Sequence, residues 1–162
     1  MADLNFAGSY DGLHLPYSPE AEQAVLGAII LESNTFDKVV DTLKSPDYFY
    51  VSLHKLIFAQ MQEMVGLGLN IDFVTLLERL KQNKAFDEST GKSYLFDLVD
   101  NCPSISNAEE YAKIIAEKYN VRRLITASRE IIDDATAGNE DPSVLIDSAE
   151  QKIFDIRQGN ER

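Results

Sequence analysis

The chain has 162 residues, of which 44% are hydrophobic and 26% are charged, and its formal net charge is −12. A chain of this length and composition can bury a core, which excludes an intrinsically disordered protein. The acidic balance disfavours strong direct binding to nucleic acid, because the field of the whole chain repels phosphate. Cys102 is the single cysteine, which excludes an internal disulfide and a four-cysteine zinc site.

The start of the chain carries no apolar periodicity. Residues 1–15 are rich in small and polar residues, and we expect them to be a flexible leader. The sequence has no apolar run of the length that a membrane span needs, and its first residues lack the basic start and apolar run of a signal peptide. We therefore expect a cytoplasmic protein.

Residues 16–106 repeat apolar side chains at helical spacing, which predicts an all-α fold that begins with a compact helical head. Ser18, Pro19 and Glu20 have the cap, the proline and the acidic residue of a helix start. Gly66, Leu67 and Gly68 are typical of a helix end. The helices expected are about 18–31, 35–43, 52–65, 73–83 and 94–99, with a polar loop at 88–91 and a partly exposed His54.

A different pattern begins at Asn107. No glycine or proline interrupts the chain from there to Gly138, which predicts one helix of about 45 Å. Asp141 and Pro142 restart a helix that continues to about Arg157. The short connection predicts that region 107–158 folds back as an antiparallel helical hairpin, followed by a tail at 159–162.

The hairpin has more apolar residues than its two arms can cover. Each arm repeats apolar residues at nearly 3.5-residue spacing, as in a coiled coil, and several positions are doubled. These candidate interface residues are Leu124, Ile125, Ile131, Ile132, Leu145, Ile146, Ile153 and Phe154. The hairpin either packs on the head or meets another subunit. We favour the subunit contact.

The sequence offers no catalytic, cofactor-binding or metal-binding site. It contains no GxxxxGK[ST] phosphate loop, and its two histidines are not paired on a helix. Neighbouring carboxylates such as Glu109 and Glu110 point about 100° apart on a helix, so they do not converge as an acid/base pair. One cationic cluster consists of Lys118, Arg122, Arg123 and Arg129. It is either a solvated or salt-bridged face or a docking patch for an acidic partner surface.

A series of short motifs follows one order from about residue 16 to 157. The motifs are PEAEQAVLGAII at 19–30, DYFY at 47–50, ID at 71–72, YL at 94–95, YAKII at 111–115, RRLI at 122–125 and DSAE at 147–150. This ordered set resembles the N-terminal region of the DnaB-type replicative DNA helicases. Thr90-Gly91 departs from the Gly-Gly pair that is common in that family, so the turn there is expected to differ.

The resemblance implies a helical collar that assembles a helicase ring. In that family the hairpins pair between subunits, the ring is a hexameric trimer of dimers, and the collar receives the C-terminal domain of primase. A helicase loader is a further partner. ATP and Mg belong to a motor domain that unwinds DNA, and since the sequence ends at Arg162 we expect neither motor nor catalysis in this segment. The alternatives are a free-standing helical adaptor that binds a helicase or a primase and, least favoured, an enzyme.

Overall fold

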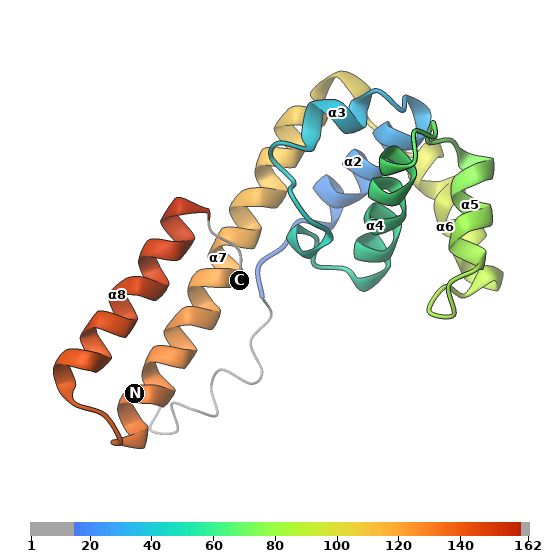
Figure 1. Ribbon diagram of the computed structural model, residues 1–162. Coiled ribbons are helices and arrows are strands. Elements are labelled where there is room, and N and C mark those ends of the chain that lie inside the picture. Colours follow the sequence, from blue (N-terminus) through green and yellow to red (C-terminus); the bar gives the residue numbers. More distant parts are fainter. Residues whose placement is uncertain (1–14, 160–162) are drawn as a thin grey trace, which may run out of the picture. The chain divides into compact units, whose positions relative to one another are not determined.

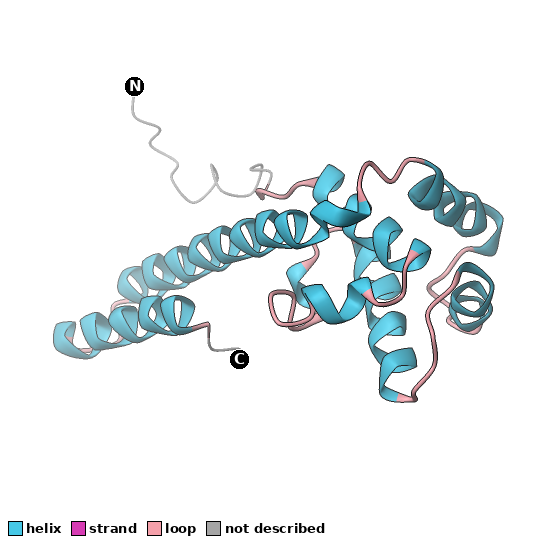
Figure 2. Ribbon diagram, turned by 90° about the horizontal axis from the view of Figure 1, so that it is seen from above, coloured by secondary structure: helices cyan, strands magenta, loops and turns pink. Residues whose placement is uncertain are grey.

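The structure is a computed structural model, and it describes residues 15–159 of the chain. Every regular element in this part is a helix, as the sequence predicted (Figure 1, Figure 2). The helices are α2 Pro19–Leu31, α3 Thr35–Val39, α4 Ser52–Gly66, α5 Phe73–Lys81, α6 Glu88–Asp100, α7 Ala108–Ala137 and α8 Pro142–Gln158, with single turns η1 Pro46–Tyr48 and η2 Ile105–Asn107. None of these helices has the length and apolar character to cross a membrane. The expected leader lies outside the described residues except for residue 15.

The chain divides into two compact units, and the division falls inside helix α7. The first unit is the head, Tyr17–Asn120, and the second unit contains the hairpin, which begins at Val121. The sequence pattern predicts this boundary at residue 107 instead. The difference arises because Ala108, Ala112 and Ile115, in the first part of α7, are buried in the core of the head.

Helix α2 is the centre of the head and packs against α3, α4, α6 and η2. It begins as predicted: the Ser18 side chain accepts a hydrogen bond from the Ala21 N–H at 3.1 Å, and Pro19 takes the first helical position. Gly27 lets α2 approach α6 closely. A Cβ atom at this position would lie 2.2 Å from the backbone oxygen of Leu98, so any larger residue would force the two helices apart.

Aromatic side chains fill the core of the head. Phe58 on α4 lies with its ring centre 4.9 Å from that of Phe49 and 5.6 Å from that of Phe36. Phe49 and Phe58 are completely buried. Burial of one such side chain contributes up to about 3 kcal/mol to the free energy of unfolding, so these rings account for a large share of the stability of the head.

Helix α4 ends in the glycine motif that the sequence predicted. Gly68 has a φ of 76°, the left-handed conformation that glycine adopts without strain. Its N–H donates to the Val65 oxygen at 3.0 Å, and the Leu69 N–H donates to the Met64 oxygen at 2.9 Å. These two bonds are those of a Schellman motif, which satisfies the last carbonyls of the helix.

Some of the expected elements differ from those observed. The polar loop expected at 88–91 is wrong, because α6 already begins at Glu88. Asp87 caps this helix by accepting from the Ser89 N–H at 3.0 Å, and the Phe86 ring packs so closely on Gly91 that a Cβ there would lie 2.3 Å from it. The helix expected at 35–43 ends earlier, at Val39.

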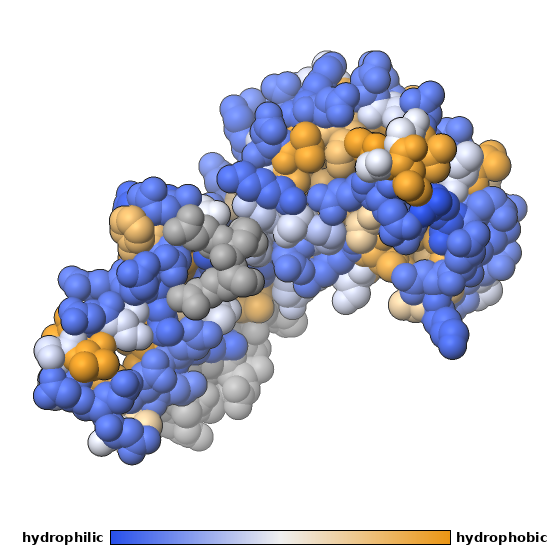
Figure 3. Space-filling model, in the orientation of Figure 1, coloured by the Kyte–Doolittle hydropathy of each residue, from blue (hydrophilic) through white to orange (hydrophobic). Residues whose placement is uncertain are grey.

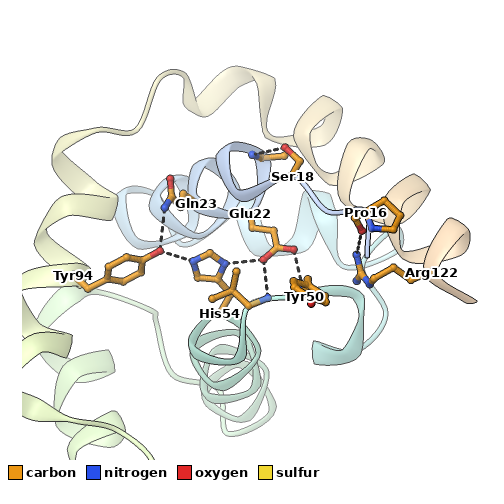
Figure 4. Close-up of polar contacts among 10 residues, drawn as sticks. Pro16, Ser18, Glu22, Gln23, Tyr50, His54, Tyr94 and Arg122 are labelled. Carbon is orange, nitrogen blue, oxygen red and sulfur yellow. Dashed lines mark hydrogen bonds and ion pairs between the residues drawn. The ribbon is translucent and has the colours of Figure 1, made fainter. Parts of the chain in front are cut away.

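A buried polar relay joins three helices of the head (Figure 4). The Glu22 carboxylate on α2 accepts from the N–H groups of Tyr50 at 2.8 Å and Val51 at 3.3 Å, just before α4. It also contacts Nδ1 of His54 at 2.7 Å, and Nε2 of His54 lies 2.6 Å from the Tyr94 hydroxyl on α6. His54 is fully buried and Glu22 is 1% exposed, so the expectation of a partly exposed His54 is wrong.

In this relay each hydrogen bond is donated toward Glu22: the Tyr94 hydroxyl donates to His54, and His54 donates to the carboxylate. Because a carboxylate only accepts, Nδ1 of His54 carries the proton that it donates to Glu22. In the neutral ring Nε2 is then an acceptor for the Tyr94 O–H. Burial raises the pKa of Tyr94, which keeps this hydroxyl protonated, and its oxygen accepts from the side-chain amide of Gln23 at 3.1 Å. Each polar group in the relay therefore has a partner.

The close contact between α2 and α6 can be tested with two glycine substitutions. We expect Gly27→Ala to lower the free energy of unfolding by about 1–3 kcal/mol, since the new methyl group meets backbone rather than a movable side chain. Gly66→Ala is the matched control, because nothing lies within 4 Å of its Cβ position. Urea denaturation measures both variants. A Gly27→Ala protein as stable as the Gly66→Ala protein would contradict the assigned contact.

The relay can be tested by changing one atom of its carboxylate. We expect Glu22→Gln to lower the free energy of unfolding by about 3 kcal/mol, because an amide NH₂ then faces buried N–H donors. Glu117→Gln, an exposed position on α7, makes the same change of charge and should stay within about 0.5 kcal/mol of the wild type. Thermal and urea unfolding followed by circular dichroism give both values, and equal losses would show that the relay adds no stability.

Candidate functional site

The hairpin consists of α8 lying antiparallel to the second part of α7 (Figure 1). As predicted, Pro142 begins α8 and Asp141 caps it, accepting from the Ser143 N–H at 3.2 Å and from its hydroxyl at 2.5 Å. These bonds lower the pKa of Asp141, so its carboxylate is charged at neutral pH and interacts favourably with the helix dipole. An ion pair between Lys152 and Glu130, at 3.4 Å, links the two arms.

The eight candidate interface residues fall into two groups. Leu124, Ile146, Ile153 and Phe154 are exposed, whereas Ile125, Ile131, Ile132 and Leu145 are half-buried. The exposed fraction reaches 60% for Ile146 and 52% for Phe154. A partner that covers these large side chains removes apolar surface from water, which favours association. The exposed group is therefore the part of the hairpin available for association.

A shallow apolar groove of about 270 Å³ lies between the arms near the turn. It is lined by Ile131 and Ala135 from α7 and by Leu145, Ile146 and Ala149 from α8. The groove brings Ile131 and Ile146, which the sequence analysis assigned to one interface, to the same place on the surface. The hairpin therefore offers an apolar side chain of a partner a place to enter.

Helical spacing extends this groove into one apolar surface, which we call the hairpin face. Val121, Leu124 and Ile131 follow each other on one side of α7, and Ile146 and Ile153 are seven residues apart on one side of α8. Val121 and Leu124 are 45% and 44% exposed. Phe154 lies about 100° around the helix from Ile153, so it is exposed on another side of α8 and stays a separate interface candidate.

The members of the cationic cluster differ in burial. Arg122 is only 8% exposed, and its guanidinium donates to the backbone oxygen of Pro16 at 2.9 Å (Figure 4). This burial argues against Arg122 as a docking residue. Lys118, Arg123 and Arg129 are half-buried, with Lys118 in the head and the two arginines in the second unit.

Sequence reasoning missed the Glu22–His54–Tyr94 relay, whose residue types also occur in acid/base catalysis. Within the relay, His54 and Glu22 have no access to a substrate, because both side chains are buried and both ring nitrogens of His54 have partners within the head. The relay joins α2, α4 and α6 by hydrogen bonds. Within residues 15–159 no group of three or more His, Cys, Asp or Glu side chains is placed to hold a metal ion.

Solved structures share this fold. The N-terminal domain of the DnaB helicase from Mycobacterium tuberculosis superposes with a TM-score of 0.80 and 29% sequence identity, covering 88% of this chain and 99% of that one. A DnaB-like replicative helicase superposes with a TM-score of 0.70 and 23% identity, covering 86% of this chain and 31% of that one. The second match shows the fold alone.

Sequence relatives lead to the same family. The replicative DNA helicase DnaB of Geobacillus stearothermophilus is 37% identical over 143 residues, and that of Pasteurella multocida is 36% identical over 149. These alignments cover 88% and 91% of this chain, which spans about a third of the length of either relative. The family model described as the DnaB-like helicase N terminal domain matches residues 14–117. The chain belongs to the family of DnaB-like helicase N-terminal domains.

Proposed function

We propose that this chain forms the collar of a replicative DNA helicase ring, in which the hairpin face joins neighbouring subunits. The observation that supports this role is the set of exposed apolar side chains around the groove of the hairpin. In the full protein a motor domain that uses ATP and Mg would unwind DNA in the cytoplasm. The segment itself would contribute assembly and partner docking.

The hairpin face has the chemistry of a self-complementary contact. Two copies related by a twofold axis present the same surface to each other, so one apolar face serves both partners. Complete burial of an isoleucine or leucine contributes up to about 3 kcal/mol to the free energy of association. In a twofold dimer each position of the hairpin face is buried in both copies, so it contributes twice. Such a contact would give a dimer through paired hairpins, and the resemblance to the replicative helicases implies three of these dimers in the complete ring.

Primase is the second partner of the proposed collar, as it is for the DnaB-like helicase whose solved structure is described with its interactions with primase. In this chain Lys118, Arg123 and Arg129 are the candidates for contact with acidic groups of a primase C-terminal domain. Charged side chains of this kind affect specificity and association rate more than affinity. A helicase loader is a further proposed partner.

Charged substitutions on the hairpin face test the assembly role. We expect Ile146→Glu and Ile153→Glu to weaken dimerisation about a hundredfold or more, since each places unpaired carboxylates in an apolar contact. Thr126→Glu, on the opposite side of α7 from Leu124, is the matched control and should leave dimerisation unchanged. Sedimentation velocity over a range of concentrations measures the association. Equal association of all three variants, or a wild-type chain that stays monomeric throughout, would contradict the proposal.

The docking role has a separate measurement. We expect the chain to bind an isolated primase C-terminal domain, and Lys118→Glu with Arg123→Glu to weaken that binding about tenfold by removing cationic contacts. Lys84→Glu, at an exposed position of the head outside the cluster, is the control. Isothermal titration calorimetry supplies the affinities. If the control and the double variant bind equally well, primase contacts another surface.

A further inference from the structure

The head exposes a group of large aliphatic side chains that the hairpin does not account for. Leu67 is 62% exposed, Leu69 is 46% exposed and Leu31 is 47% exposed, with Val65 beside them at the end of α4. We call Leu31, Val65, Leu67 and Leu69 the leucine patch. Figure 3 shows an orange area of this kind over the end of α4 and the segment that leads to α5.

Hydrogen bonds hold the parts of the leucine patch together. The Schellman motif fixes the turn around Gly68 and therefore the directions of Leu67 and Leu69. The Ile71 N–H donates to the Ser33 hydroxyl at 2.9 Å, which ties this turn to the end of α2, where Leu31 lies. The patch is thus presented on an ordered backbone, so a partner would not need to order it on binding.

Carboxylates border the leucine patch. The two segments that contribute it, 31–34 and 63–72, contain Glu32, Glu63 and Asp72 and no lysine, arginine or histidine. Hydrogen bonds from Thr75 lower the pKa of Asp72, which keeps that carboxylate charged. Arg79 is the cation that pairs with this border, through Glu63. Since Arg79 already pairs with Glu63, the negative rim beside the apolar centre consists of Glu32 and Asp72.

We infer that the leucine patch docks a basic amphipathic helix of a partner protein, one whose apolar stripe is flanked by lysine or arginine. The apolar stripe would cover the leucines while the flanking cations face the carboxylates. A helix fits better than an extended peptide, because residues 15–159 contain no strand whose edge could pair with one. This docking site belongs to the head and does not depend on the hairpin face.

Charge separates this occupant from other candidates. A second copy of the chain would bring two acidic rims together at this surface. Nucleic acid and anionic membrane surfaces would be repelled for the same reason. A basic partner gains from both parts of the surface, since the apolar contact and the charge contact act together.

A synthetic amphipathic helix tests the inference directly. The probe is a labelled fourteen-residue peptide of leucine and lysine, with leucines at helical spacing, and the control peptide replaces every lysine with glutamate. We expect the first peptide to bind the wild-type chain and the second not to bind. We expect Leu67→Ser combined with Leu69→Ser to weaken binding about tenfold, because both side chains are exposed and their loss leaves the core of the head intact.

Val74→Ser is the matched protein control, since Val74 is 68% exposed on α5 and belongs to neither the patch nor its rim. Fluorescence anisotropy gives the affinities, and circular dichroism verifies that each variant is folded. Binding that is weakened equally by Val74→Ser, or not weakened by the leucine substitutions, would overturn the inference. So would a loss of self-association in the leucine variant, which would assign the patch to a second copy of the chain.

Discussion

The buried carboxylate of Glu22 is the constraint around which the head is arranged. A charge without solvent is costly unless donors surround it, and Glu22 meets this requirement with two backbone N–H groups before α4 and with Nδ1 of His54. These donors hold the start of α4 against α2, and Tyr94 extends the same relay to α6. Apolar packing alone would allow several slightly different orientations of the three helices, because it has little directionality. The hydrogen bonds of the relay are directional and select one of these orientations.

The two units of the chain use their apolar residues in different ways. In the head many large side chains are enclosed, as the fully buried Phe49 and Phe58 show, and the exposed leucines lie at the end of α2 and in the turn after α4. In the hairpin the described residues include exposed aliphatic side chains on both arms and only Ala127 as a buried apolar side chain. A unit with so little enclosed apolar volume depends on contacts outside itself for stability. Assembly of the collar would provide them.

Local signals in the sequence were sufficient for most helix boundaries. Ser18, Asp72 and Asp141 cap the helices that were expected to follow them, and Gly68 ends α4, because these interactions join residues only a few positions apart. The start of α6 was missed since the contact of Phe86 with Gly91 made a polar segment helical. The partners of His54 lie 32 and 40 residues away, so no local pattern indicated its burial. Periodicity predicted the apolar positions of the hairpin, whereas the exposed fraction of each side chain depends on contacts between the two arms.

Helix α7 belongs to both units, and this has a consequence for the insertions and deletions that the chain can accept. Its first part contributes Ala112 and Ile115 to the core of the head, and its second part contributes Leu124 and Ile131 to the hairpin face. One residue inserted between these parts would turn every later side chain by about 100° around the helix axis. Seven inserted residues would restore the direction to within about 20°. Natural selection can therefore constrain the number of residues between Ile115 and Leu124, independently of which residues occupy this part of α7.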